Sequence, residues 1–301
     1  MGFLDDAQSA LGRGMSAARG AVSGVALESI GFVRRFVRMC DDGWNQGWHE
    51  RNGGNASYRL TEQDISSARP FFAESPSAWQ SLGVNAPSLA NAFFLVTAAG
   101  SFMRNIALDP DCAVGIVEIG PVGDAYRIVW GLRDSGRPTS EFAGHVLMHE
   151  ARVLSGNDDS RVIYHAHPVP VIAMTKVVPL DNRTLTRVLW KAMTECVMVF
   201  PEGVGVVGPK VPGSLDLARA SAEQMRTHAA VVWAHHGLLC AGTNFDDAFG
   251  RMHAIVKAAE IYTTARMMSG GDADFANDVG DDVLRGIAES LGLSLNEDYL
   301  A

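Results

Sequence analysis

The sequence predicts an α/β fold in which a mixed, largely antiparallel central sheet is covered by helices. Short runs rich in Val, Ile, Phe and Trp are typical of half-buried strands, and they interleave with stretches whose apolar residues recur at helical spacing. The two kinds of segment show no regular βαβα repeat, and several strand-like runs follow one another directly. No internal repeat or linker-like change in composition divides the chain. We therefore expect one domain over residues 27–301, preceded by a poorly ordered extension at 1–26.

The individual elements follow from the same patterns. Residues 27–48 predict a first helix, because apolar side chains such as Phe32, Val33 and Phe36 recur on one face. The segment ERNGGN at 50–55 is a loop by composition and ends that helix. Strands are expected at 56–60, 92–99, 113–119, 125–132, 161–167, 203–208 and 229–237. Further helices are expected at 140–154, 184–196, 214–228, 246–269 and 281–291.

Composition excludes several classes of function. The 301 residues carry a formal net charge of −9 and no long basic run, which argues against binding to nucleic acid or to an anionic membrane. No apolar run approaches the roughly 20 residues of a membrane span, and the N-terminus lacks the pattern of a secretory signal. The four cysteines form no CxxC pair, which is typical of reduced cysteines. We expect a cytoplasmic protein, and a small anionic substrate is compatible with this composition.

Two histidines stand one residue apart in the predicted strand VIYHAHPV. Side chains alternate between the faces of a strand, so His165 and His167 point the same way and could share one metal ion. A third histidine, His235 or His236, ends the apolar run at 229–237, just before Gly237. Three histidines without a fourth protein ligand are typical of a catalytic zinc site with an open position.

A second histidine pair competes with this interpretation. His145 and His149 lie four residues apart on a predicted helix, a spacing that also binds metal. The helix lacks the HExxH motif, however, because Glu150 follows the second histidine and not the first. We interpret this pair as surface or packing histidines.

Two carboxylates are candidates for proton transfer. Glu141 opens the predicted helix at 140–154, where a structural glutamate would also be favoured by the helix dipole. Glu195 lies where a helix is expected to give way to a strand, and it could equally be a structural residue at the helix end.

A neutral glycine loop is the candidate anion site. Gly53 and Gly54 allow backbone N–H groups to approach a ligand, and Asn52 and Asn55 add amide donors. Hydroxyl groups that could add further donors are those of Thr97, Ser101, Thr139 and Ser140.

Taken together, these segments resemble the class II aldolase family. The matching stretches are GWHERNGGN, VTAAGSFMRN, WGLRDSGRPTSE, VIYHAH, TECVMVFPEGVG, the VPG that follows it, and HHG. They occur in the family's order and cover about residues 27–292. The chain departs from the family pattern at Ala99, where a serine is usual, and it lacks the lysine expected near Ser101.

The resemblance implies a class II aldolase/adducin-like domain that performs zinc-dependent retro-aldol cleavage. The nearest members cleave L-rhamnulose 1-phosphate to dihydroxyacetone phosphate and L-lactaldehyde, as homotetramers with active sites between subunits. One Zn²⁺ per subunit would be held by His165, His167 and His236. Glu141 would be the acid/base, and Glu195 would serve the site of a neighbouring subunit. The phosphate would lie at Asn52, Asn55, Thr139 and Ser140, together with the glycine loop.

Three alternatives remain open on the sequence. A related sugar-phosphate aldolase or 4-epimerase would use the same metal and the same bond cleavage. A zinc hydrolase would use the open metal position for an activated water, with Glu141 as its base. A non-catalytic module of the adducin type would keep the fold without the reaction.

Overall fold

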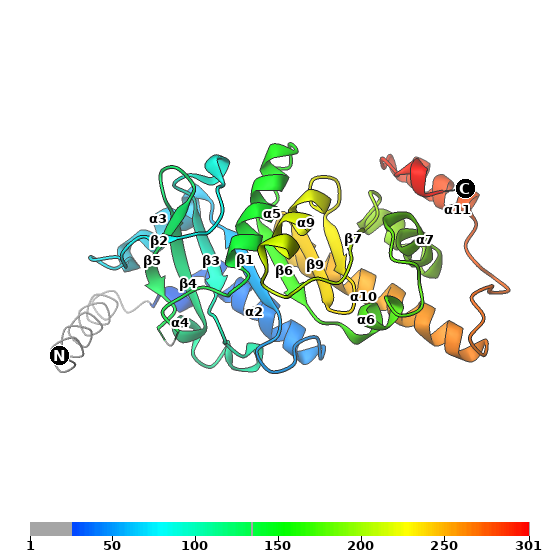
Figure 1. Cartoon of the computed structure of the whole chain (residues 1–301), viewed down its shortest axis with the longest axis horizontal. Helices are drawn as coiled ribbons and strands as arrows, with labels where there is room; N and C mark the ends of the chain where they lie inside the picture. Colours follow the sequence, from blue (N-terminus) through cyan, green and yellow to red (C-terminus); the bar gives the residue numbers. More distant parts are fainter. Residues whose placement is uncertain (1–25, 134, 301) are drawn as a thin grey trace.

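The computed structural model describes residues 26–133 and 135–300, and its strands form one sheet of nine (Figure 1). The extension predicted at residues 1–26 lies outside the described residues, apart from Ala26. Along the sheet the strand order is β2-β5-β4-β3-β1-β6-β9-β8-β7, and only β7 and β8 pair in parallel. The strands are β1 (Asn55–Arg59), β2 (Gln80–Ser81), β3 (Phe93–Thr97), β4 (Val114–Ile119), β5 (Ala125–Gly131), β6 (Val162–Ala166), β7 (Gly205–Val207), β8 (Ala230–Trp233) and β9 (Gly237–Gly242). The prediction of a mixed, largely antiparallel sheet is confirmed.

Helices cover both faces of this sheet. On one face α2 and α10 pack against apolar side chains of β1, β6 and β9, and on the other face α5 and α9 pack against β6, β8 and β9. The α-helices are α2 (Gly31–Asn45), α3 (Glu62–Ala68), α4 (Pro110–Ala113), α5 (Phe142–Leu154), α6 (Val169–Met174), α7 (Asn182–Ala192), α8 (Cys196–Val199), α9 (Leu215–Gln224), α10 (Phe245–Met268) and α11 (Asp281–Leu291). Short 3₁₀ turns lie at Leu27–Ser29, Arg69–Phe71, Pro87–Leu89, Met103–Asn105 and Glu297–Tyr299.

The alternation of side chains along β6 decides where the histidines point. Val162, Tyr164 and Ala166 belong to the apolar core shared with α2 and α10. Ile163 belongs to the core under α5 and α9. Because the period of a strand is two, His165 shares the face of Ile163 and points toward the α5 and α9 side.

One predicted strand is shorter than expected and is followed by another. The run at 229–237 was expected to be a single strand ending at the glycine, but β8 ends at Trp233 and Gly237 begins β9. His235 and His236 therefore occupy the turn of a hairpin. The physical reason is the backbone of His235, whose φ of 62° is left-handed and ends the extended conformation there.

The prediction of a strand after Glu195 was wrong. Residues Cys196–Val199 form the short helix α8, in which Cys196 and Val197 are buried. A run of four apolar residues does not distinguish a strand from a helical turn by periodicity, and here tertiary packing against α10 and α11 decides.

Several short elements were not anticipated. Strand β2 and helices α3, α4 and α6 fall in segments without a clear period, although Thr61 and Asp64 form a capping box that could have indicated α3. The first helix begins at Gly31, after a 3₁₀ turn, and not at Leu27. None of the helices in the described ranges combines the length and the apolar character that a membrane span needs. The four cysteines, which all lie in the described part of the chain, form no disulfide.

Candidate metal centre

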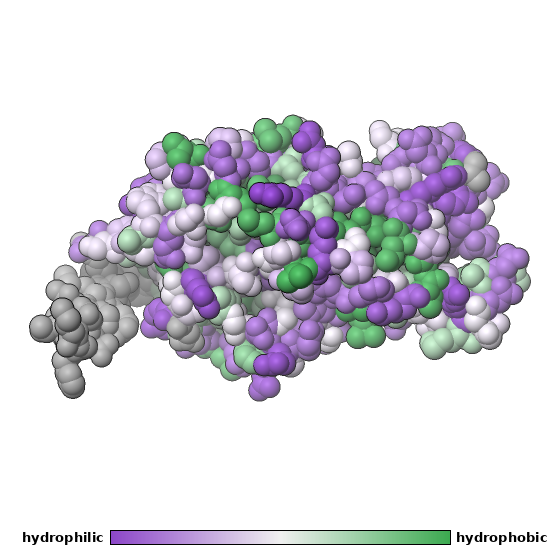
Figure 2. Space-filling model, viewed as in Figure 1, coloured by the Kyte–Doolittle hydropathy of each residue, from purple (hydrophilic) through white to green (hydrophobic). Residues whose placement is uncertain are grey.

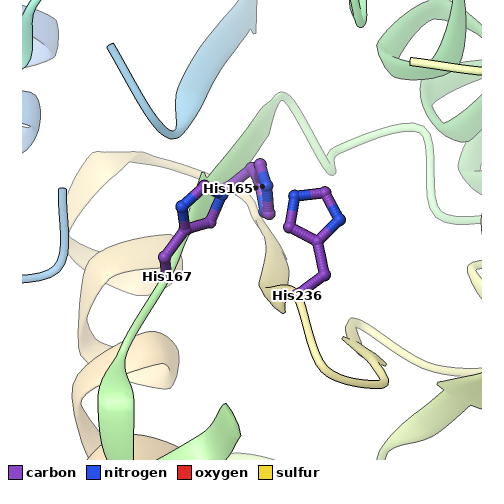
Figure 3. A group of neighbouring side chains, drawn as sticks. All are labelled: His165, His167 and His236. Carbon is purple, nitrogen blue, oxygen red and sulfur yellow. Dashed lines mark hydrogen bonds between the residues drawn. The ribbon is translucent and has the colours of Figure 1, made fainter. Parts of the chain in front are cut away.

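Three histidine rings converge at the end of β6 (Figure 3). His165 lies in β6, His167 directly follows it, and His236 comes from the β8–β9 turn. One nitrogen atom of each ring lies within 4.8 Å of the others, and the Nε2 atoms of His165 and His167 are 3.1 Å apart. Two nitrogens bound to one tetrahedral zinc at about 2.0–2.1 Å would be about 3.3 Å apart. The spacing therefore fits a shared metal ion.

Hydrogen bonds to the opposite ring nitrogens turn two of these imidazoles toward the centre. His165 Nδ1–H donates to the carbonyl oxygen of Leu238 at 3.1 Å, and His167 Nδ1–H donates to Glu50 Oε1 at 2.7 Å. Both Nε2 atoms are then left with a lone pair for a metal. Burial, together with the neighbouring histidines, lowers the pKa of His165 well below its usual range, and burial lowers the pKa of His236 to about 4. Both rings are therefore neutral near pH 7 and able to bind a cation.

Glycines allow the backbone to come this close to the rings. A Cβ added at Gly53 would lie 2.9 Å from His167 Cε1, and one at Gly237 would lie 3.0 Å from both His165 Cε1 and His167 Cδ2. Gly54 has a φ of +76°, and an added Cβ there would lie 2.2 Å from His49 Nδ1. The glycine loop that the sequence suggested as an anion site thus packs directly against the histidine cluster.

His49 was not identified from the sequence, yet it holds this loop in place. It is buried, its Nδ1–H donates to the carbonyl oxygen of Gly53 at 3.1 Å, and its Nε2 accepts from the Tyr164 hydroxyl at 2.7 Å. Burial lowers the pKa of His49 to about 4, so the ring is a neutral structural link.

Glu141 lies beside the cluster at the N-cap of α5. Its Oε2 is 4.0 Å from His165 Nε2 and accepts a hydrogen bond of 2.9 Å from Asn55 Nδ2. Burial raises the pKa of the Glu141 carboxyl, while the hydrogen bond from Asn55 and the electrostatic influence of His167 oppose the rise. A carboxyl with a raised pKa next to a metal centre is suited to taking up and releasing protons.

The candidate hydroxyl residues form two adjoining segments. Ala98 bridges to Pro138, and Thr139 N–H donates to the carbonyl oxygen of Thr97, so residues 97–101 lie beside 137–141. Ser140 is exposed and lines a pocket with Glu141, Gly213, Ser214 and Trp233. Trp233 packs on the rings of both His165 and His236, so this pocket adjoins the histidine cluster.

Two of the predicted substrate-binding residues already have protein partners. Thr97 is buried, and its Oγ1 accepts from Ala56 N–H at 3.2 Å. Asn55 is buried, and both ends of its carboxamide are paired, with Glu141 and with His145. Direct contact with a phosphate would require either residue to give up a partner. Asn52 is exposed in the loop, and Ser101 donates its hydroxyl to the carbonyl oxygen of Ala98.

His235 and Glu195 are not brought into the cluster. His235 is exposed and turned away, with its Nδ1 3.1 Å from Thr175 Oγ1, so His236 is the histidine of the pair that joins the other two. Glu195 is exposed at the start of α8, where it accepts a hydrogen bond from Thr194 Oγ1.

His145 and His149 are buried and not on the surface. Both have no exposed area and both face β1, where Ser57 Oγ lies 2.8 Å from His145 Nδ1 and 2.9 Å from His149 Nε2. Their spacing of four residues could have indicated that they share a buried face of the helix. Nothing in the sequence indicates that this face packs against Asn55 and Ser57, which alternate along β1.

A further cavity, of about 680 Å³, lies away from the histidines between α7, α10 and residues 273–278. Its basic residues include Arg187, which pairs with Asp281, and Lys191, which pairs with Asp278. None of the three clustered histidines lines this cavity, so the candidate metal site lies at the end of β6 and not here.

Comparison with known proteins gives matches to a family, to individual relatives and to solved structures. Residues 34–263 match the family described as Class II Aldolase and Adducin N-terminal domain. The chain is 40% identical over 245 residues to rhamnulose-1-phosphate aldolases of Pectobacterium atrosepticum and Yersinia pestis, covering 81% of this chain and 89% of each relative. A sugar-phosphate aldolase of Thermotoga maritima superposes with a TM-score of 0.66 at 27% identity, over 79% of this chain and 95% of that one. An L-fuculose-1-phosphate aldolase of Thermus thermophilus shares the fold, with a TM-score of 0.52 at 19% identity, over 80% of this chain and 97% of that one.

Two glycine substitutions should separate backbone strain from crowding at the centre. Gly47 and Gly54 both have φ near +75°, but an added Cβ meets nothing within 4 Å at Gly47. We expect Gly47→Ala to cost about 1 kcal/mol of unfolding free energy and to leave metal affinity unchanged. Gly54→Ala should cost more and weaken metal binding, since the loop must move away from His49. Denaturant unfolding and metal titration measure both effects, and equal behaviour of the two variants would contradict the packing argument.

The stability of the metal-free protein should fall as the pH drops below about 6.5. Burial lowers the pKa of His145 to about 3 and that of His149 well below its usual value of 6.5. As the pH falls below 6.5, these histidines become protonated in the unfolded chain but stay neutral in the folded chain. The unfolded state is therefore favoured, and the stability present above pH 6.5 is lost on acidification. Below pH 6.5, each such histidine lowers the free energy of unfolding by about 1.4 kcal/mol per pH unit. Denaturant unfolding over this range should show a smaller slope in His149→Phe than in the unmodified chain; identical slopes would rule out the neutral buried His149.

Proposed function

The chain belongs to the family of class II aldolases and adducin N-terminal domains, and we propose from this membership that it cleaves L-rhamnulose 1-phosphate to dihydroxyacetone phosphate and L-lactaldehyde. The observation that carries the proposal is the convergence of His165, His167 and His236 beside the buried carboxyl of Glu141. Rhamnulose-1-phosphate aldolases that are 40% identical over 81% of the chain support the choice of substrate.

The metal we propose is one Zn²⁺ per subunit, held by His165, His167 and His236. The donor set supports it, because three imidazole nitrogens, with no fourth ligand in the cluster from the part of the chain that the structure describes, suit a catalytic zinc with an open position. Zinc in this position supplies a Lewis acid for the carbonyl group of a ketose. The hydrogen bonds from His165 to Leu238 and from His167 to Glu50 hold the rings in the orientation that such a site needs.

Glu141 is the residue we assign to proton transfer at C3 of the substrate. Cleavage requires the C4 hydroxyl to lose its proton while the C3–C4 bond breaks, and the enediolate that remains takes up a proton at C3. The Glu141 carboxyl lies 4.0 Å from His165 Nε2, next to the place where the ketose would be held. Its raised pKa, caused by burial, brings proton release closer to neutral pH.

For the phosphate group we propose Asn52, the glycine loop at Gly53 and Gly54, Ser101, Thr139 and Ser140. The support is their position: the loop packs against His167, and Ser140 lines the pocket that adjoins the cluster. Because their polar groups are paired within the protein, Thr97 and Asn55 suit the organisation of the site better than contact with phosphate.

We propose that the enzyme works as a cytoplasmic homotetramer in which Glu195 completes the site of a neighbouring subunit. Glu195 is exposed and lies outside the histidine cluster of its own chain. Apolar side chains also remain on the surface, including Val211, which is 72% exposed, and Leu215 at the start of α9. Figure 2 shows hydrophobic side chains gathered along the middle of the face on which α9 lies, as a subunit contact would need.

Metal content should distinguish the two adjacent histidines of the β8–β9 turn. We expect His236→Ala to lose bound zinc, because one of three ligands is removed, and we expect the matched control His235→Ala to keep it, because His235 is turned toward Thr175. Dialysis followed by elemental analysis measures zinc per subunit. Full occupancy in His236→Ala, or loss in His235→Ala alone, would overturn the ligand assignment.

Cleavage of L-rhamnulose 1-phosphate tests the reaction. Release of dihydroxyacetone phosphate should stop after chelation and return with added zinc. Glu141→Gln should retain zinc and lose at least about 100-fold in kcat, since a general acid/base contributes about 10²–10⁴-fold. Formation of an epimeric sugar phosphate without free aldehyde would instead identify a 4-epimerase, and near-normal turnover by Glu141→Gln would remove Glu141 from the mechanism.

A further inference from the structure

A buried line of polar side chains runs from Glu141 into the interface between α5 and β1. It consists of Asn55 and Ser57 on β1 and His145 and His149 on α5. We propose that His145, Ser57 and His149 are positioning residues that hold Asn55, and through it the carboxylate of Glu141, in one orientation. This inference rests on the proposed function, because it gives Glu141 the proton transfer.

The contacts are continuous and enclosed. From Glu141 inward, the bonds are Asn55 Nδ2 to Glu141 Oε2 at 2.9 Å, His145 Nε2 to Asn55 Oδ1 at 2.5 Å, Ser57 Oγ to His145 Nδ1 at 2.8 Å, and His149 Nε2 to Ser57 Oγ at 2.9 Å. Ser57, His145 and His149 have no exposed area, and Asn55 is 7% exposed. Water therefore does not substitute for these partners, and each group depends on the next.

Matching periods of helix and strand bring the line together. Glu141, His145 and His149 follow one another at intervals of four residues, so they share one face of α5. Asn55 and Ser57 are two residues apart and share one face of β1. The two rows interleave, so the polar groups meet without a gap between them.

Only one direction of donation satisfies the line when Glu141 is ionised. A carboxylate only accepts, so Asn55 presents its NH₂ group to Glu141 and its carbonyl oxygen to His145. His145 must then carry its proton on Nε2, and its Nδ1 accepts from the Ser57 hydroxyl. Ser57 Oγ in turn accepts from His149 Nε2–H. Every donor points toward Glu141, and such aligned bonds strengthen one another.

The far end of the line agrees with this direction. His149 Nδ1 is buried and has no hydrogen-bond partner among the described residues. With the proton on Nε2, this orphan atom is an acceptor lone pair and not a buried N–H group, and native structures tolerate an unpaired acceptor more readily than an unpaired donor.

The line orients the carboxylate but does not conduct protons. An asparagine carboxamide cannot pass a proton from one end to the other without forming an unstable tautomer, so Asn55 interrupts any relay. Asn55 instead binds Oε2 of Glu141, the oxygen that lies 4.0 Å from His165 Nε2, while Oε1 has no hydrogen-bond partner within the described residues. If the carboxamide turned over, two oxygens would meet and Glu141 would lose its fixed position.

Turnover by variants of the zinc-loaded enzyme tests the proposal. His145→Phe fills the space but removes both hydrogen bonds, and we expect kcat to fall about 10- to 100-fold, while KM changes less than about threefold and zinc content is unchanged. His145→Gln keeps a donor near the position of Nε2 and should recover most of kcat. His228→Phe is the matched control, because it removes another buried, hydrogen-bonded histidine that contacts Tyr299 and not Glu141, and it should turn over normally.

Two results would overturn the positioning role. One is normal kcat in His145→Phe, and the other is an equal loss in His145→Phe and His145→Gln. If His145→Phe does not fold, the ¹⁵N NMR spectrum of histidine-labelled, unmodified enzyme decides, since the line requires the Nε2–H tautomer at His145. An Nδ1–H tautomer there would contradict the proposed direction.

These outcomes are separable from failure of the proposed function. If Glu141→Gln turns over normally, the assignment of Glu141 fails and the inference falls with it. If Glu141→Gln is inactive while His145→Phe has normal kcat, the aldolase reaction stands and only the positioning line is rejected.

Discussion

The pairing of β1 with β6 sets the geometry of the whole centre. Asn55 lies directly opposite His165 in this antiparallel pair, and Ser57 lies opposite Ile163. Because side chains alternate along a strand, a slip of one residue would turn Asn55 and His165 to opposite faces of the sheet. The same register places Asn55 beside Glu141 and keeps Glu141 4.0 Å from His165 Nε2. Asn55, which binds the acid/base candidate Glu141, and the candidate metal ligand His165 are thus held by one strand pair, flanked by β3 and β9, while His236 comes from the β8–β9 turn.

Burial is the second condition on which the centre depends. It lowers the pKa of His165 and His236, so the rings keep the lone pairs that a metal needs, and it raises the pKa of the Glu141 carboxyl. Such burial is costly unless polar groups find partners. Here the partners come from the backbone at Leu238 and from side chains such as Glu50 and Asn55. Glycines at positions 53, 54 and 237 remove the side chains that would otherwise hold the loops away.

The single chain leaves one predicted participant outside the centre. Glu195 is exposed at the start of α8, and the apolar side chains of Val211 and Leu215 are also exposed. Together they fit a protein that completes its sites by association, as proposed above. The buried side chains from Glu141 to His149 differ from Glu195, because the hydrogen bonds that link them are all made within one chain. The orientation of Glu141 would then be built during folding, while the outer wall of the site would form on assembly.

The sequence by itself determined much of this protein. Strand and helix periods predicted the mixed sheet and most of its covering helices, and period two placed His165 and His167 on one face. Ordered motifs indicated the family, which the comparisons confirmed. Local pattern did not separate His236 from His235, because that choice depends on a left-handed residue in the β8–β9 turn. Nor did it show that His145 and His149 are buried against Ser57, since a helix and a strand that are 88 or more residues apart in the chain meet only in the folded structure. Periodicity is a local property that can be read along the chain. Strand register, burial and hydrogen-bond partners are set by contacts between distant segments, so only the tertiary structure decided them.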